Sequence, residues 1–116
     1  MRTAISGATR DDNDGKLDYF KFFSAVAFNA YCKYMFEKRV QPDGALRDAD
    51  NWQKGMPRHW YCESAERHLL DVVYHTKGFP ELADETLETA LCALMFNTQA
   101  YLHEILIDRS VEEISE

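Results

Sequence analysis

Apolar residues recur along most of the chain at three- and four-residue steps, the spacing of one face of an α-helix. The pattern predicts a first helix over residues 17–40, with Asn13 or Asp14 as its N-cap. The apolar stripe of this helix contains Phe20, Phe23, Ala27, Ala30, Tyr31 and Tyr34.

Two further helices follow the same pattern. One is predicted from Arg58 or His59 to Lys77, ending at Gly78, a good C-terminal cap. The other starts with Pro80 in its first turn and ends near residue 107. The core-facing stripe of the second helix is expected to contain Cys62, Ala65, Glu66, Leu69, Val72, Val73 and Thr76; that of the third contains Leu87, Ala90, Leu91, Leu94, Met95, Thr98 and Leu102.

Residues 41–57 carry two prolines and two glycines, and they predict a long loop between the first two helices. Long loops in small domains are more often functional than not. With no convincing strand, the sequence predicts an all-α bundle of three long helices. We expect a flexible lead-in over 1–15, a helical domain over 16–108 and an acidic tail over 109–116.

Composition narrows the class of protein. The 116 residues fit one domain, and 46% hydrophobic residues can bury a core. Twenty acidic against 13 basic residues give a net charge of -7, which argues against polymeric nucleic acid and anionic membranes as partners. No apolar stretch is long enough to span a membrane. Three cysteines without a Cys-x-x-Cys pair favour reduced thiols and a cytoplasmic protein.

Some of the carboxylates lie in line with apolar stripes. Glu63 and Glu66 project from nearly the same face of the second helix. Tracing the apolar stripe of the third helix back by one and two turns reaches Glu88 and Asp84. Clustered carboxylates repel one another and favour a cation, and Mg²⁺ prefers such oxygen ligands. The same acids are also typical of a solvated surface or of a helix N-terminus.

The pair Glu63-x-x-Glu66, followed after 14 residues by Glu81-Leu82-Ala83-Asp84, resembles the acidic pairs of the MazG-like all-α nucleoside triphosphate pyrophosphohydrolases. The resemblance implies that these pairs bind Mg²⁺, with Mn²⁺ as a substitute. It also implies that water attacks the phosphate chain, releasing a nucleoside monophosphate and pyrophosphate.

Four segments in order, GKLDYF, NWQKG, AERHLLDVV and LETALCALMFN, resemble the phage-type dATP/dGTP diphosphohydrolase N-terminal domain. The resemblance marks the loop residues Asn51, Trp52, Lys54 and Gly55. On the second helix it marks Arg67 and His68. Histidines typical of that family's final helix are absent, and Thr89 stands in the place of one of them.

Each of these residues has a functional and a structural interpretation. Trp52 is suited to stacking on a purine or to covering the core, and Lys54 is suited to phosphate binding. Arg67 suits a phosphate or a neighbouring acid, and His68 suits proton transfer or a structural hydrogen bond. Asn97 can contact a base edge or a neighbouring helix.

These observations and the resemblance together predict a magnesium-dependent pyrophosphohydrolase acting on a purine (deoxy)nucleoside triphosphate. Glu63 and Glu66 are the predicted catalytic residues. Metal binding is assigned to Glu63, Glu66, Asp84 and Glu88, with Glu81 and Glu85 as alternates. Because three helices bury a limited core, we expect a homodimer or higher oligomer. The alternative is a catalytically inactive phage-encoded bundle that binds nucleotides or proteins in the host cytoplasm.

Overall fold

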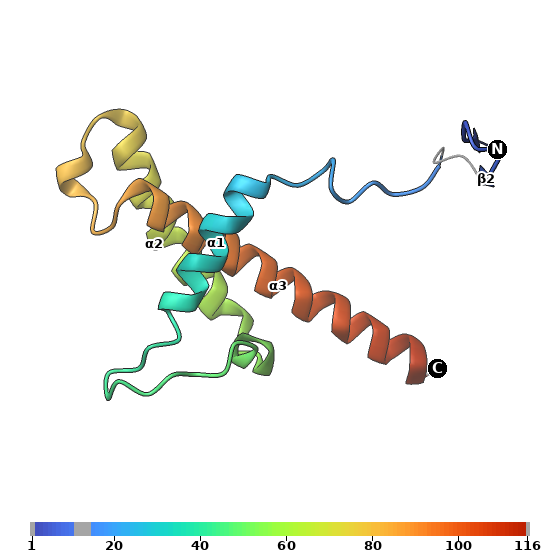
Figure 1. The fold of residues 1–116 in the computed structure, drawn as a ribbon. Coiled ribbons are helices and arrows are strands. Elements are labelled where there is room, and N and C mark those ends of the chain that lie inside the picture. The colour runs from blue at the N-terminus through green and yellow to red at the C-terminus, as the bar shows by residue number, and fades with distance from the viewer. Residues whose placement is uncertain (1, 11–14, 116) are drawn as a thin grey trace.

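The computed structural model describes residues 2–10 and 15–115, with side chains as far as Asp108. Three helices dominate it (Figure 1): α1 (Ala25–Glu37), α2 (Arg58–Lys77) and α3 (Leu87–Ser115). Two 3-10 turns, η1 (Asn51–Lys54) and η2 (Pro80–Leu82), lie in the connections. The structure is mostly helical, in agreement with the predicted all-α class.

The N-terminal segment contains strands that the sequence did not predict. β1 (Arg2–Thr3) and β2 (Thr9–Arg10) form a small antiparallel hairpin in which Arg2 pairs with Arg10. The Ala4 amide donates to the Ala8 carbonyl at 2.7 Å and closes the turn. Strands of two residues leave no hydrophobic alternation in a sequence, which explains why the pattern gave no sign of them.

The first helix is shorter than predicted at both ends. Ser24 is its N-cap, because the Ser24 hydroxyl accepts a hydrogen bond from the Ala27 amide at 3.1 Å. The predicted caps, Asn13 and Asp14, lie outside the described residues. At the other end the helix stops at Glu37, since the chain turns and Val40 pairs with Leu46 in a β-bridge.

The second helix has the predicted bounds. It begins at Arg58, whose guanidinium pairs with Asp108 of α3. It ends at Gly78, which adopts a left-handed conformation with φ 90°. The Gly78 and Phe79 amides donate to the carbonyls of His75 and Tyr74, so the helix end is capped as the glycine predicted.

The third helix begins at Leu87, seven residues later than the predicted Pro80. Pro80 supports only the single turn η2, because Ala83 is extended and ends it. Thr86 then caps α3, its hydroxyl accepting from the Thr89 amide at 3.2 Å. The helix continues to Ser115, so the predicted end near residue 107 is wrong and the backbone of the expected tail is helical as far as Ser115.

The α2 and α3 helices pack against each other in antiparallel orientation, and α1 contacts α3 (Figure 1). Ser64 meets Asn97 near one end of the α2–α3 seam, and Asp71 meets the segment before α3 at the other. The α2 residues along this seam are mostly polar: Tyr61, Ser64, His68, Asp71 and His75.

Apart from Ala90, which is buried, the larger residues of the predicted α2 and α3 stripes do not face this seam. Leu69 of α2 keeps 51% of its surface exposed, and Leu91 and Leu102 of α3 keep 45% and 54%. Among the described residues, the buried hydrophobic side chains are mostly small, and they are Tyr31, Tyr61, Ala90, Cys92, Ala93 and Ala100. The prediction that the stripes face a core within one chain is therefore confirmed for Ala90 and Tyr31, which are buried, and wrong for Leu69, Leu91 and Leu102. None of the described helices is long and apolar enough to span a bilayer.

Candidate functional site

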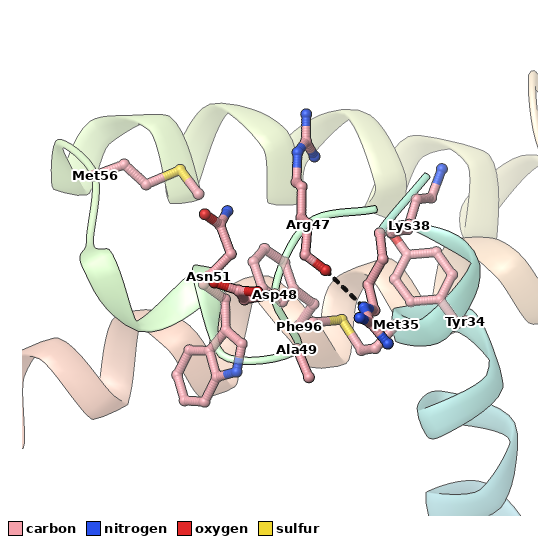
Figure 2. Close-up of a pocket in the computed structure, with 11 residues that line it drawn as sticks. Tyr34, Met35, Lys38, Arg47, Asp48, Ala49, Asn51, Met56 and Phe96 are labelled. Atoms are coloured by element: carbon pink, nitrogen blue, oxygen red, sulfur yellow. Dashed lines mark hydrogen bonds between the residues drawn. The ribbon is translucent and has the colours of Figure 1, made fainter. Parts of the chain in front are cut away.

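The predicted functional loop closes a hollow of about 240 Å³ against α1 and α3 (Figure 2). Cationic side chains come from the end of α1 and from the loop, at Lys38 and Arg47. Aromatic and amide groups come from Trp52, Asn51 and Phe96. The hollow therefore combines surfaces that suit an aromatic ring with cations that suit phosphate, and the Asp48 carboxylate lines it as well.

Arg39 fixes the loop to α1. Its Nε donates to the Arg47 carbonyl at 2.7 Å, and the Arg47 amide donates to the Arg39 carbonyl at 2.7 Å. The Arg39 guanidinium also lies 5.7 Å from the centre of the Phe36 ring. These contacts give Arg39 a structural role, whereas the Arg47 side chain is exposed and lines the hollow.

Trp52 lies half-buried in η1, in contact with α3. Its ring centre is 4.9 Å from that of His103, with the rings inclined at 69°. The indole therefore packs on α3 and also lines the hollow, which combines the two interpretations left open by the sequence. Lys54, the predicted phosphate ligand in the same turn, is exposed and lies outside the lining of this hollow.

Gly55 positions this turn on α3. Its φ of 82° and ψ of 163° are accessible almost only to glycine. A Cβ at this position would also lie 3.6 Å from Oε1 of Glu104. The conformation, rather than lack of space, makes glycine necessary here, since 3.6 Å is an ordinary contact distance.

Gly55→Ala is expected to lower the free energy of unfolding by about 1–3 kcal/mol, the cost of a side chain in this backbone region. Urea denaturation of the two proteins measures the difference. Gly44→Ala is the matched control for positive φ, because Gly44 lies at the tip of the loop with φ 84° and no neighbour within 4 Å. Equal stability of Gly55→Ala and the unsubstituted protein would contradict the role given to Gly55.

A second hollow of about 340 Å³ adjoins the first, since Met56 and Phe96 line both. It brings together three of the predicted site residues, Glu63 and Arg67 of α2 and Asn97 of α3. Glu63 and Arg67 are exposed, one helical turn apart on α2. A carboxylate and a guanidinium thus stand beside the aromatic hollow.

Asn97 is buried, with 5% of its surface exposed. Its Nδ2 donates to the Ser64 hydroxyl at 3.2 Å and to the Ala93 carbonyl at 2.9 Å. Both amide hydrogens are thereby used between and within the helices. The structure thus shows the helix-pairing role that the sequence analysis had set beside base recognition.

His68 belongs to a polar network rather than to either hollow. Its Nδ1 lies 2.5 Å from Oε1 of Glu85, so the carboxylate accepts from the imidazole. The Nε2 of His75 donates to the Glu85 carbonyl at 2.7 Å. Asp71, which is 6% exposed, accepts from the amides of Asp84 and Glu85, each at 3.2 Å. The network holds the segment before α3 against α2.

The sequence analysis did not single out Asp71. It lies between apolar residues, and its spacing of seven residues from Ser64 was the available signal, because both occupy the face that meets α3. Nothing in the stripe pattern marks that face, which is polar.

The predicted metal ligands are separated within one copy of the chain. Glu63 precedes Ser64, which meets Asn97, whereas the Asp84 amide meets Asp71. Eight residues of α2 separate these levels, or ~12 Å along the helix axis. Glu66, Glu81, Asp84 and Glu88 are exposed, while Glu85 pairs with His68. Within residues 2–10 and 15–108, no three His, Cys, Asp or Glu side chains form a group suited to a metal ion.

Glu104 is a further carboxylate beside the loop, and the sequence analysis did not identify it. It accepts a hydrogen bond from the Tyr61 hydroxyl, while its buried Oε2 has no hydrogen-bond partner. Burial, and then the Glu104 carboxylate, raise the pKa of Tyr61 to about 12. The pKa of Tyr34 is also raised to about 12, first by burial and then by Glu85.

These tyrosines predict a loss of stability in alkali. Each pKa is higher in the folded chain than the ordinary 10.0, so folding favours the protonated phenols. The contribution of the two phenols to the free energy of unfolding is complete below pH 10 and is lost as the pH rises from 10 to 12. Urea denaturation at pH 8 to 11.5 should show falling stability, and Tyr61→Phe should reduce the slope above pH 10. A slope unchanged by the substitution would contradict the effect assigned to Tyr61.

No match was found with known protein families, with curated proteins or with solved structures.

Proposed function

We propose that the chain is a magnesium-dependent pyrophosphohydrolase that converts a purine (deoxy)nucleoside triphosphate and water into the monophosphate and pyrophosphate. One observation supports this proposal most directly. The two adjoining hollows share Phe96; Trp52, Lys38 and Arg47 line the first, and Glu63 and Arg67 line the second. The MazG-like resemblance of the acidic pairs points to the same activity.

The base is assigned to the aromatic part, where Trp52 offers a stacking surface. Arg67, one of the predicted phosphate ligands, shares the second hollow with Phe96. Lys54 is placed to contact phosphates only from outside the hollow. His68 and Asn97 then act as positioning residues, because their ring and amide groups hold α2 against its neighbours.

Glu63 and Glu66 are the acids that fit Mg²⁺ best. They lie one turn apart on α2, and both are exposed. Magnesium in nucleotide sites commonly takes one or two carboxylates and completes its shell with substrate phosphates and water. Held by these glutamates, Mg²⁺ would supply charge to neutralise the phosphates and would make water more acidic. One of the two glutamates would accept the proton of the attacking water. Asp84 lies at a different level of α2 from Glu63, so the two do not meet at one ion within a single copy of the chain.

Incubation with dATP or dGTP and Mg²⁺, followed by chromatography of the products, tests the activity. Equal amounts of monophosphate and pyrophosphate are expected. Glu66→Gln should reduce the rate by at least about 100-fold, the order of effect seen when a general base or charge partner is removed. Glu37→Gln, an exposed acid at the end of α1, is the matched control and should leave the rate unchanged. Product formation that is equal in Glu66→Gln would contradict the role of Glu66.

The alternative is a bundle that binds nucleotides or proteins without turnover. Two observations favour this inactive bundle. Glu63 and Asp84 are separated within one copy, and the chain lacks the histidines typical of the resembled family. Calorimetry with dATP separates the two functions. Binding without product supports the inactive alternative, whereas neither binding nor product contradicts a nucleotide-related function.

We further propose that the chain acts in the cytoplasm as a homodimer or higher oligomer. Cys32, Cys62 and Cys92 are all free thiols, which suits a reducing compartment. The exposed apolar stripes support an oligomer.

A further inference from the structure

The α2–α3 pair has an apolar surface on the side of the predicted stripes, called the outer face here. On α2 it is formed by Cys62, Ala65, Leu69 and Val72, and on α3 by Leu91, Met95, Thr98, Leu102 and Ile105. Cys62 and Ala65 line one shallow groove together with Thr98, Leu102 and Ile105, so the two rows share a face. None of the nine side chains is charged, and the exposed carboxylate of Glu66, one turn from both Cys62 and Leu69, lies at the edge of the face.

The rows have the spacing of a helix-packing seam. Successive members are three and four residues apart on α2, and four and three apart on α3. This alternation keeps side chains on one line of a helix and is the pattern by which helices pack around a shared core. Leu69, Leu91 and Leu102 keep about half of their surface exposed, so the seam is formed but uncovered within one chain.

The inner seam, where α2 meets α3, cannot supply the missing core. The α2 residues on the inner seam are mostly polar, and their α3 neighbours include Ala90, Ala93 and Asn97. The radius of gyration is 19.7 Å, against about 13 Å for a compact chain of this length. Part of this excess comes from the N-terminal segment, which extends away from the helices (Figure 1). A chain with so little internal core needs a partner whenever it is folded, and a second copy is always present with it.

We propose that the outer faces of two copies pack against each other and complete a four-helix core. The row spans about 15 Å on α2 and about 21 Å on α3, and two adjacent helices are ~10 Å apart, so a pair of such faces buries on the order of 1,000 Å² in total. That area reaches the lower range of stable interfaces. The same rows meet in both copies, which is the geometry of a two-fold homodimer.

This inference specifies the interface of the oligomer proposed above, and it does not depend on nucleotide hydrolysis. Sedimentation equilibrium of the full chain tests it directly. A mass of about 27 kDa is expected, twice the 13.5 kDa of one chain. Leu91→Lys and Leu102→Lys would each bury a charge in the apolar centre, and each should raise the dimer dissociation constant by at least about 100-fold.

Val26→Lys is the matched control, since Val26 is 83% exposed on α1, away from the outer face. It should leave the mass unchanged. A dimer that persists in both outer-face variants would overturn the assignment of the interface. A chain that is monomeric and cooperatively folded at all concentrations would overturn the homodimer and assign the face to a different protein.

A measurement on the unsubstituted chain tests the dimer even where the lysine variants fail to fold. A dimer that is required for folding has a melting temperature that rises with protein concentration. A rise across a 100-fold concentration range is expected. A melting temperature independent of concentration, together with a mass of 13.5 kDa, would overturn the proposal. Activity assays do not enter either measurement, so a failure here is separate from a failure of the proposed hydrolase.

Discussion

Asp71→Ala is expected to lower the free energy of unfolding by about 3 kcal/mol, a large share of the stability of a small domain. The Asp71 carboxylate is 6% exposed and accepts from the amides of Asp84 and Glu85. Hydrogen bonds to an ionised acceptor contribute about 1.5–3 kcal/mol each, and their loss leaves two amides without partners. Urea denaturation followed by circular dichroism measures the change.

The effect should be local to the start of α3. Hydrogen exchange at the Asp84 and Glu85 amides is expected to accelerate in Asp71→Ala, because these amides lose their acceptor. Glu81→Ala changes an exposed acid in the same connection and should alter stability by less than about 0.5 kcal/mol. Unchanged exchange at both amides would show that Asp71 does not hold this segment.

The ends of the helices could be predicted where a single residue determines them. Gly78 ends α2 because its left-handed conformation is costly for other residues, and this is visible in the sequence. The start of α1 was misplaced because Ser24 follows an aromatic run that also fits helical periodicity. The start of α3 was misplaced because Asp71 holds Asp84 and Glu85 outside the helix, a contact between residues 13 and 14 positions apart.

The faces of the helices were harder to predict than their positions. Periodicity shows that Leu69, Leu91 and Leu102 share one side of their helices, but it does not show whether that side meets the same chain or another. The inner seam is polar at Ser64 and Asn97, which pair with each other and so satisfy their hydrogen bonds. A hydrophobic pattern alone cannot identify such a seam.

The candidate site was predicted in part. Trp52, Glu63, Arg67 and Asn97 line adjoining hollows, although they come from a loop and two helices. Lys38 was not considered because it follows the apolar stripe of α1 and carries no motif. It lines the hollow because the loop turns back at Gly44 and returns beside the end of α1. That placement depends on the β-bridge after α1, which no local pattern predicts.

Trp52→Ala is expected to weaken nucleotide binding by about 10- to 100-fold, since stacking of one base on an aromatic ring contributes about 1–3 kcal/mol. Calorimetry with dATP and Mg²⁺ measures the loss, and Trp52→Phe should restore most of the affinity because it keeps a stacking surface. Because the ring also packs on His103, urea denaturation of both variants is needed to show that they are folded under the binding conditions. If Trp52→Ala loses stability but binds dATP as tightly as the unsubstituted protein, the ring covers α3 and does not contact the base. Equal losses in the alanine and phenylalanine variants would likewise contradict stacking, because phenylalanine keeps an aromatic surface on which a base can stack.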